Sequence, residues 1–117
     1  MSENIIADKS KAFAVKIIKL YQYLLDVKKE FVLSKQLLKS GTSIGANVRE
    51  AHRSQSKREF IAKMNIALKE AAESEYWLEL LHETGYLSDD KFVDVMSDCG
   101  ELNKLLISII KTSNNHL

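Results

Sequence analysis

The chain has 117 residues, of which 45% are hydrophobic, and a formal net charge of +1. This length suits one hydrophobic core, so we expect residues 1–117 to form a single domain. Proline is absent and only four glycines occur, which argues against the many tight turns of a β architecture and predicts an all-α chain. No apolar run approaches the roughly 20 residues of a membrane span, and the N-terminus lacks a signal-peptide pattern. We therefore expect a soluble, cytoplasmic protein with no membrane partner.

The first two helices follow from the spacing of apolar residues. Residues 4–27 carry them at steps of seven, four and three, ending at Val27, which places them on one face of a helix. A similar pattern predicts a second helix over about residues 30–54. This helix contains Gly41 and Gly45, each of which costs about 1 kcal/mol relative to alanine in a helix interior. Small residues four apart expose one strip of backbone, so we predict that a helix of the same or a neighbouring subunit packs closely there; a kink or a ligand notch is the alternative.

The third and fourth helices have clear end signals. The third covers about residues 57–84, begins after the capping residue Ser56, and is ended by Gly85. The fourth begins after Ser88, a second capping residue, and runs to about residue 113. Four helices of this length joined by short turns predict an antiparallel, up-down-up-down four-helix bundle.

Charge is distributed unevenly along the chain. Residues 28–63 hold nine lysines or arginines against three glutamates, a net charge of +6, whereas residues 64–117 carry −6. Attraction between oppositely charged helices or subunits explains this pattern, and a basic surface for nucleic acid is the alternative. The basic residues gather near the turn between the second and third helices and upstream of it: Arg49, Arg53, Lys57, Arg58 and Lys63, with Lys28, Lys29, Lys35 and Lys39. We select Arg49, Arg53, Lys57 and Arg58 as the candidate nucleic-acid contacts.

Part of the third helix lies outside its own core stripe. Three apolar residues would be exposed there unless another surface buries them: Ile66, Trp77 and Leu80. Tryptophan is favoured at protein interfaces. We therefore predict that these three residues lie in an oligomer interface. Oligomerisation would also strengthen nucleic-acid binding, because several subunits multiply the phosphate contacts that one subunit makes weakly.

Groups that could perform catalysis are few. Only one Glu-x-x-His pair is present, Glu79 with His82, whereas a carboxylate-bridged dimetal centre needs two, so we predict no metal site. Cys99 is the only cysteine; its place in an apolar stripe predicts a small core residue, and it excludes an intrachain disulfide. We predict no catalytic residue, no cofactor and no enzyme activity; a metal-dependent enzyme is an alternative.

Several polar residues lie beside the apolar stripes of the predicted helices. We expect them to be partly buried and to hydrogen-bond across helices, to partners such as Arg49 or Lys69, because buried polar groups must be paired. They are Asn47, Glu50, Glu70, Glu73 and Asn103.

Residues 34–81 carry a family resemblance. SIGAN at residues 43–47, EA at 50–51, IALKEA at 66–71 and YWL at 76–78 occur in the expected order. This stretch closely resembles the four-helix-bundle protein family associated with intervening sequences in bacterial 23S ribosomal RNA genes, also called the S23 ribosomal protein family. The resemblance implies a bacterial homopentamer similar to the accessory variability protein of diversity-generating retroelements, which is basic, binds nucleic acid and joins a reverse transcriptase.

Together, the residues and the resemblance predict a non-enzymatic, homo-oligomeric scaffold, pentameric by resemblance, that binds RNA or DNA through the basic turn. The net charge of +1 departs from the basic relative and weakens that analogy, although not at the turn itself. The alternative is a purely structural or protein-interaction role without nucleic acid, with a reverse transcriptase or another acidic protein as the partner.

Overall fold

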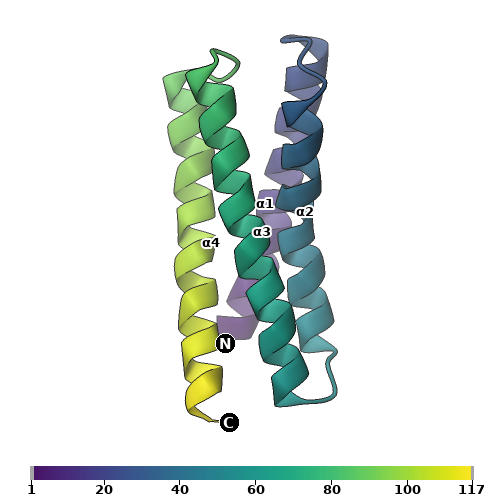
Figure 1. Ribbon diagram of the computed structural model, residues 1–117, viewed down its shortest axis with the longest axis vertical. Helices are drawn as coiled ribbons and strands as arrows, with labels where there is room; N and C mark the ends of the chain where they lie inside the picture. Colours follow the sequence, from purple (N-terminus) through teal and green to yellow (C-terminus); the bar gives the residue numbers. More distant parts are fainter. Residues whose placement is uncertain (1, 117) are drawn as a thin grey trace.

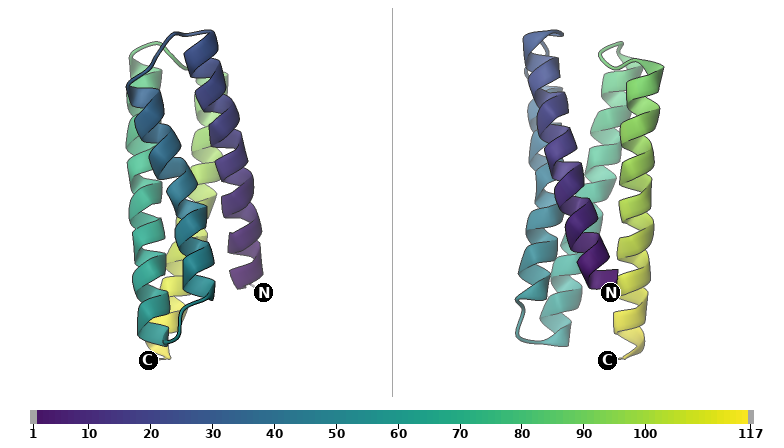
Figure 2. Two further views of the ribbon diagram at one scale, coloured as in Figure 1. Left: turned by 90° about the vertical axis from the view of Figure 1, so that its right-hand side faces the viewer. Right: turned by 180° about the vertical axis from the view of Figure 1, so that it is seen from behind.

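The computed structural model describes residues 2–116, which form four helices and no strand. Helix α1 covers Ser2–Asp26, α2 covers Leu33–His52, α3 covers Lys57–Glu83 and α4 covers Asp89–Asn115. Consecutive helices run antiparallel, and α4 returns beside α1, so the predicted all-α four-helix bundle is confirmed (Figure 1). The bundle measures 47 × 20 × 19 Å, and α1 begins at the same end at which α4 finishes (Figure 2).

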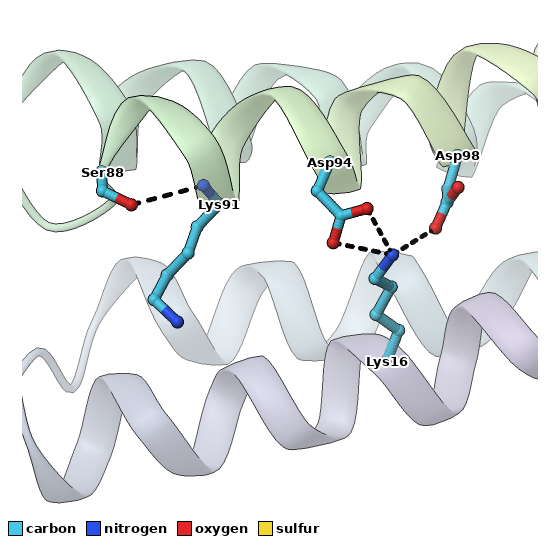
Figure 3. Close-up of polar contacts among 5 residues, drawn as sticks. All are labelled: Lys16, Ser88, Lys91, Asp94 and Asp98. Carbon is cyan, nitrogen blue, oxygen red and sulfur yellow. Dashed lines mark hydrogen bonds and ion pairs between the residues drawn. The ribbon is translucent and has the colours of Figure 1, made fainter.

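Local signals set the ends of α3 and α4, as predicted. The hydroxyl of Ser56 accepts the Glu59 backbone N–H at 3.1 Å, and the hydroxyl of Ser88 accepts the Lys91 backbone N–H at 3.3 Å (Figure 3). Gly85 follows α3 with φ of +87°, a left-handed conformation that glycine adopts without a steric penalty.

Helix α2 begins three residues later than predicted, because residue 30 caps the helix from outside. Lys29, directly before Glu30, takes a left-handed conformation with φ of +56°. The Glu30 carboxylate accepts backbone N–H groups from Val32 at 2.9 Å, from Leu33 at 2.9 Å and from Ser34 at 2.6 Å. A glutamate in this position satisfies the N–H groups that a helix start leaves without partners.

The core runs the full length of the bundle between the four helices. Its largest fully buried side chains come from every helix: Ile6, Ile17, Leu24, Leu37, Ile44, Met64, Leu78, Leu81, Leu102 and Leu106. The prediction that Val27 belongs to this core was wrong; α1 ends one residue earlier, and Val27 is 63% exposed. Within residues 2–116, no helix is long and apolar enough to cross a membrane.

The glycine strip of α2 faces α1 of the same subunit. A Cβ atom on Gly41 would lie 2.9 Å from two side-chain carbons of Ile17, closer than real Cβ contacts allow. A Cβ atom on Gly45 would lie 3.4 Å from the backbone oxygen of Ser10, which is an ordinary contact. Glycine at position 41 is therefore needed for the close approach of α1 and α2.

Ion pairs join the first and last helices. The Lys16 ammonium lies 2.9 Å from the Asp94 carboxylate and 2.7 Å from the Asp98 carboxylate (Figure 3), and Lys9 lies 3.2 Å from Glu101. The hydrogen bond to Asp98, followed by that to Asp94, raises the pKa of Lys16. These side chains are substantially exposed to solvent, so each pair stabilises the packing of α1 on α4 by at most about 1 kcal/mol.

Candidate nucleic-acid interface

The four candidate phosphate contacts surround the turn between α2 and α3. Arg49 lies in the last turn of α2, Arg53 follows that helix directly, and Lys57 and Arg58 begin α3. All four side chains are exposed to solvent. The structure therefore brings these cations together at one end of the bundle, where α1 begins and α4 ends (Figure 2).

These four cations have no acidic partner in the part of the chain that the structure describes. The neighbouring Lys63 is paired, with its ammonium 2.9 Å from the Glu50 carboxylate, and the hydrogen bond that Lys63 donates to Glu50 raises the pKa of Lys63. Within residues 2–116, no ion pair joins the basic residues 28–63 to the acidic residues 64–117. The opposite net charges of these two segments are therefore not neutralised by ion pairs between them in the described part of the chain.

The upstream lysines do not belong to this surface. Lys28, Lys29 and Lys35 lie near the turn between α1 and α2, at the opposite end of the bundle. Helix α2 separates the two ends by about 30 Å, at 1.5 Å per residue. Lys39 lies about one turn further along α2 and lines a hollow with Glu70 and Glu73. The upstream lysines therefore lie apart from the patch after α2, which alone contains the candidate residues.

Two hollows meet at His52, the last residue of α2. One, of about 590 Å³, opens at the end of the bundle and is lined in part by Asn4, Gln55 and Phe60. The other, of about 570 Å³, is a groove between α1 and α2. Its lining combines small side chains with three cations and with Glu50, whose carboxylate pairs with Lys63: the small residues include Ala7, Ala14, Gly45 and Ala46, and the cations are Lys11, Arg49 and Arg53. The His52 ring is exposed and stacks over Phe60, with ring centroids 6.2 Å apart and 21° between the ring planes.

Comparison with known proteins identifies the family. Residues 2–108 match the 23S rRNA-intervening sequence protein family. The chain belongs to this family. A crystal structure of a protein of unknown function from the S23 ribosomal protein family of Bacteroides thetaiotaomicron VPI-5482 shares 58% identity with this chain, covers 95% of this chain and 99% of its own, and superimposes with a TM-score of 0.94. No protein with a curated description matches.

The family resemblance seen in the sequence is thus confirmed, and the 23S rRNA-intervening sequence proteins are not a known enzyme family. In this family member, the predicted interface residues lie on α3: Ile66 is 41% exposed, while Trp77 and Leu80 are half-buried. The Trp77 indole N–H is buried without a hydrogen-bond acceptor in residues 2–116. Their role between subunits stays a prediction.

The side chains that suggested other chemistry in this intervening-sequence protein have structural partners. Cys99 is fully buried, its thiol donates to the Ala71 carbonyl at 3.4 Å, and burial raises its pKa to about 12, so its predicted place in the core is confirmed. The His82 ring stacks on Phe92 with centroids 4.1 Å apart, and its Nε2 lies 2.7 Å from the Asp89 carboxylate. Among residues 2–116, no three His, Cys, Asp or Glu side chains gather as a metal site requires.

The polar residues beside the core differ from expectation. Glu50 and Glu73 are exposed, so the prediction that they are partly buried was wrong, whereas Glu70 and Asn103 are half-buried. Burial, followed by repulsion from Glu73, raises the pKa of Glu70. Glu50 does bond across helices, but to α3 through Lys63 and not to Arg49 or Lys69.

A buried polar contact between α2 and α3 was missed. The hydroxyls of Ser40 and Ser74 lie 2.9 Å apart in the core, and the Ser74 hydroxyl also lies 3.0 Å from the Glu70 carbonyl. The predicted cross-helix role of Asn47 was wrong, because its amide donates to the Ser43 carbonyl of its own helix at 2.8 Å. A serine in an apolar stripe resembles any other small packing residue, so the sequence offers no signal for this pair.

Proposed function

We propose that this 23S rRNA-intervening sequence protein is a non-enzymatic scaffold that assembles into a homo-oligomer, a pentamer, and binds nucleic acid through the turn between α2 and α3. One observation supports binding at this turn above all others: four exposed cations without acidic partners lie together at one end of the bundle. Cations that neutralise phosphates release condensed counterions, which favours association with nucleic acid at low salt.

Assembly strengthens this proposal physically. One subunit offers Arg49, Arg53, Lys57 and Arg58 as a small patch, which alone binds weakly and loses affinity with salt. A ring of identical subunits repeats the patch with a fixed spacing, so that second and later contacts become intramolecular. The resemblance to the nucleic-acid-binding accessory variability protein points to the same arrangement.

The test is a binding titration with structured RNA and duplex DNA over a series of salt concentrations. We expect binding at low salt with an affinity that falls linearly on a log–log plot, and loss of binding when Arg49, Arg53, Lys57 and Arg58 are all changed to glutamate. A matched control makes the same charge change elsewhere, at Lys28, Lys29, Lys35 and Lys39, and should retain binding. Absence of binding at low salt, or equal loss in both variants, contradicts the proposal. Light scattering tests assembly, and a monomer contradicts it.

A protein-interaction role without nucleic acid is the second candidate, and a specific surface favours it. Val27, Phe31 and Val32 in the turn between α1 and α2 are 63%, 58% and 71% exposed, beside Lys28 and Lys29. Such an apolar patch with lysines at its edge fits an acidic protein, for example a reverse transcriptase. This role predicts no binding in the nucleic-acid titration, together with weaker capture of an acidic partner by Phe31→Ser than by the unchanged protein.

A further inference from the structure

We infer that the basic end of the bundle takes an unpaired stretch of RNA or DNA, with one base stacked on His52 and the neighbouring phosphates bound by Arg49 and Arg53. This inference rests on the proposed function and names its ligand class: a single strand, not a duplex. Two features of the structure lead to it, the junction of the two hollows at His52 and the exposed ring that His52 presents there.

The groove between α1 and α2 fits the sugar-phosphate backbone of one strand. Its lining includes small residues such as Gly45 and Ala46 together with Lys11, Arg49 and Arg53, and the one acidic residue among them, Glu50, is paired with Lys63. None of these three cations forms an ion pair with the side chains of residues 4–116. A groove with a net positive charge is the arrangement by which proteins follow the backbone of a single strand without reading its sequence.

The hollow at the end of the bundle fits a base. Its lining mixes an aromatic ring, Phe60, with uncharged polar side chains, among them Asn4 and Gln55. The amides of Asn4 and Gln55 make no side-chain hydrogen bond within the described residues, so both are free to donate to or accept from the edge of a base. Base edges are open to such contacts only where the strand is unpaired.

His52 lies where the two hollows meet, and its position suits stacking. His52 is exposed, and its ring is stacked with that of Phe60, with 6.2 Å between the ring centroids and 21° between the planes. A base placed on the His52 ring would continue this stack, as bases do on aromatic side chains of single-strand binding proteins. In a duplex, both faces of each base are already covered by neighbouring base pairs, so a duplex gains only the phosphate contacts.

The experiment measures fluorescence anisotropy with a single strand of RNA, the same sequence as single-stranded DNA, and the corresponding duplexes, all at one low salt concentration. We expect the unchanged protein to bind the single strands about tenfold more tightly than the duplexes. His52→Ala should lose about this factor for single strands and nothing for duplexes. His52→Phe should retain single-strand binding, because it keeps the ring and removes only the imidazole nitrogens. Because His52 is exposed, replacing it should not disturb folding, and circular dichroism checks the helix content of both variants.

The salt dependence separates the two roles. His52→Ala should leave the slope of log affinity against log salt unchanged, whereas Arg53→Ala should reduce it by about one. A 2-aminopurine base in the strand should lose fluorescence on binding the unchanged protein and keep it with His52→Ala. If no probe binds, the proposed function fails and this inference fails with it. If duplexes bind as well as single strands and His52→Ala changes nothing, the proposed function stands and the inference is overturned.

Discussion

Replacing Glu30 by alanine removes the acceptor of three backbone N–H groups at the start of α2. The Glu30 carboxylate receives N–H groups from Val32, Leu33 and Ser34 at 2.9, 2.9 and 2.6 Å, and the residue is only 7% exposed. The first N–H groups of a helix have no carbonyl partner within it. Alanine therefore leaves these donors without their acceptor in a largely buried turn.

The expected loss follows from the kind of hydrogen bond. Removing a helix cap costs about 0.5–2 kcal/mol, and a hydrogen bond to a charged group is worth about 1.5–3 kcal/mol. The three bonds share one carboxylate and are not additive, so we expect Glu30→Ala to lower the free energy of unfolding by about 2–3 kcal/mol. Glu30→Gln keeps one oxygen without the charge and should lose about 1 kcal/mol.

The pH dependence gives the prediction a second, independent signature. Burial by itself raises the pKa of Glu30, but the hydrogen bonds from Ser34, Leu33 and Val32 outweigh it and lower the pKa below its ordinary value of 4.5. A carboxyl whose pKa is lowered by folding contributes its full stability above its unfolded pKa, and that stability is lost as the pH falls through the folded pKa. The difference between the unchanged protein and Glu30→Ala should be full at neutral pH and should shrink below pH 4.5.

Urea unfolding followed by circular dichroism, with all variants at one protein concentration, measures both effects. Glu79→Ala is the control, since it removes an exposed carboxylate that has no ion pair within residues 2–116 and should change stability by no more than about 0.5 kcal/mol. Equal free energies of unfolding for Glu30→Ala and Glu79→Ala would refute the capping role of Glu30. So would a difference that is the same at neutral and at low pH.

The remaining predictions concern the helix contacts and the single thiol. Gly41→Ala should lower the free energy of unfolding by about 1–3 kcal/mol, because the new Cβ meets Ile17 at 2.9 Å. Gly100→Ala, which has open space around the new Cβ, should raise it by about 0.5–1 kcal/mol. Thermal unfolding measures both variants, and equal changes in their melting temperatures contradict the proposed contact with Ile17. Lys29→Gly should stabilise by about 1 kcal/mol in the same measurement, because glycine relieves the left-handed φ of +56°; a loss of stability contradicts this. The Cys99 thiol, with its pKa raised to about 12, should not react with a thiol reagent at pH 8 until urea unfolds the chain, and rapid reaction of the folded protein contradicts its burial.

Features encoded within a few residues could be predicted from the sequence. The periodic apolar residues gave four helices, and Ser56, Gly85 and Ser88 marked where three helix ends lie. The start of α2 could not be predicted in this way. Its capping residue, Glu30, is not of a typical capping type and reaches the helix only because Lys29 takes a left-handed conformation, which lysine seldom adopts.

The candidate site depends on which helices face one another, and this packing could not be predicted from the sequence. Arg49, Arg53 and Lys63 look equivalent along the chain, but the packing of α2 on α3 pairs Lys63 with Glu50 and leaves the other two without an acidic partner. Similarly, the lysines near the turn between α1 and α2 are close to the candidate residues in sequence and lie a helix length away from them in space. The charge of each residue is local information, whereas its neutralisation is decided by the fold.

The glycine strip connects this packing to the candidate site. Gly41 lets α1 approach α2 closely, and Gly45, about one turn later on the same strip, lines the groove that His52 also lines. A large side chain at position 45 would reduce the space in this groove, which Arg49 also lines. Gly41 and Gly45 therefore act differently although they lie on one strip: contact with Ile17 requires the first, whereas the second has room for a Cβ atom beside Ser10 and lines the groove.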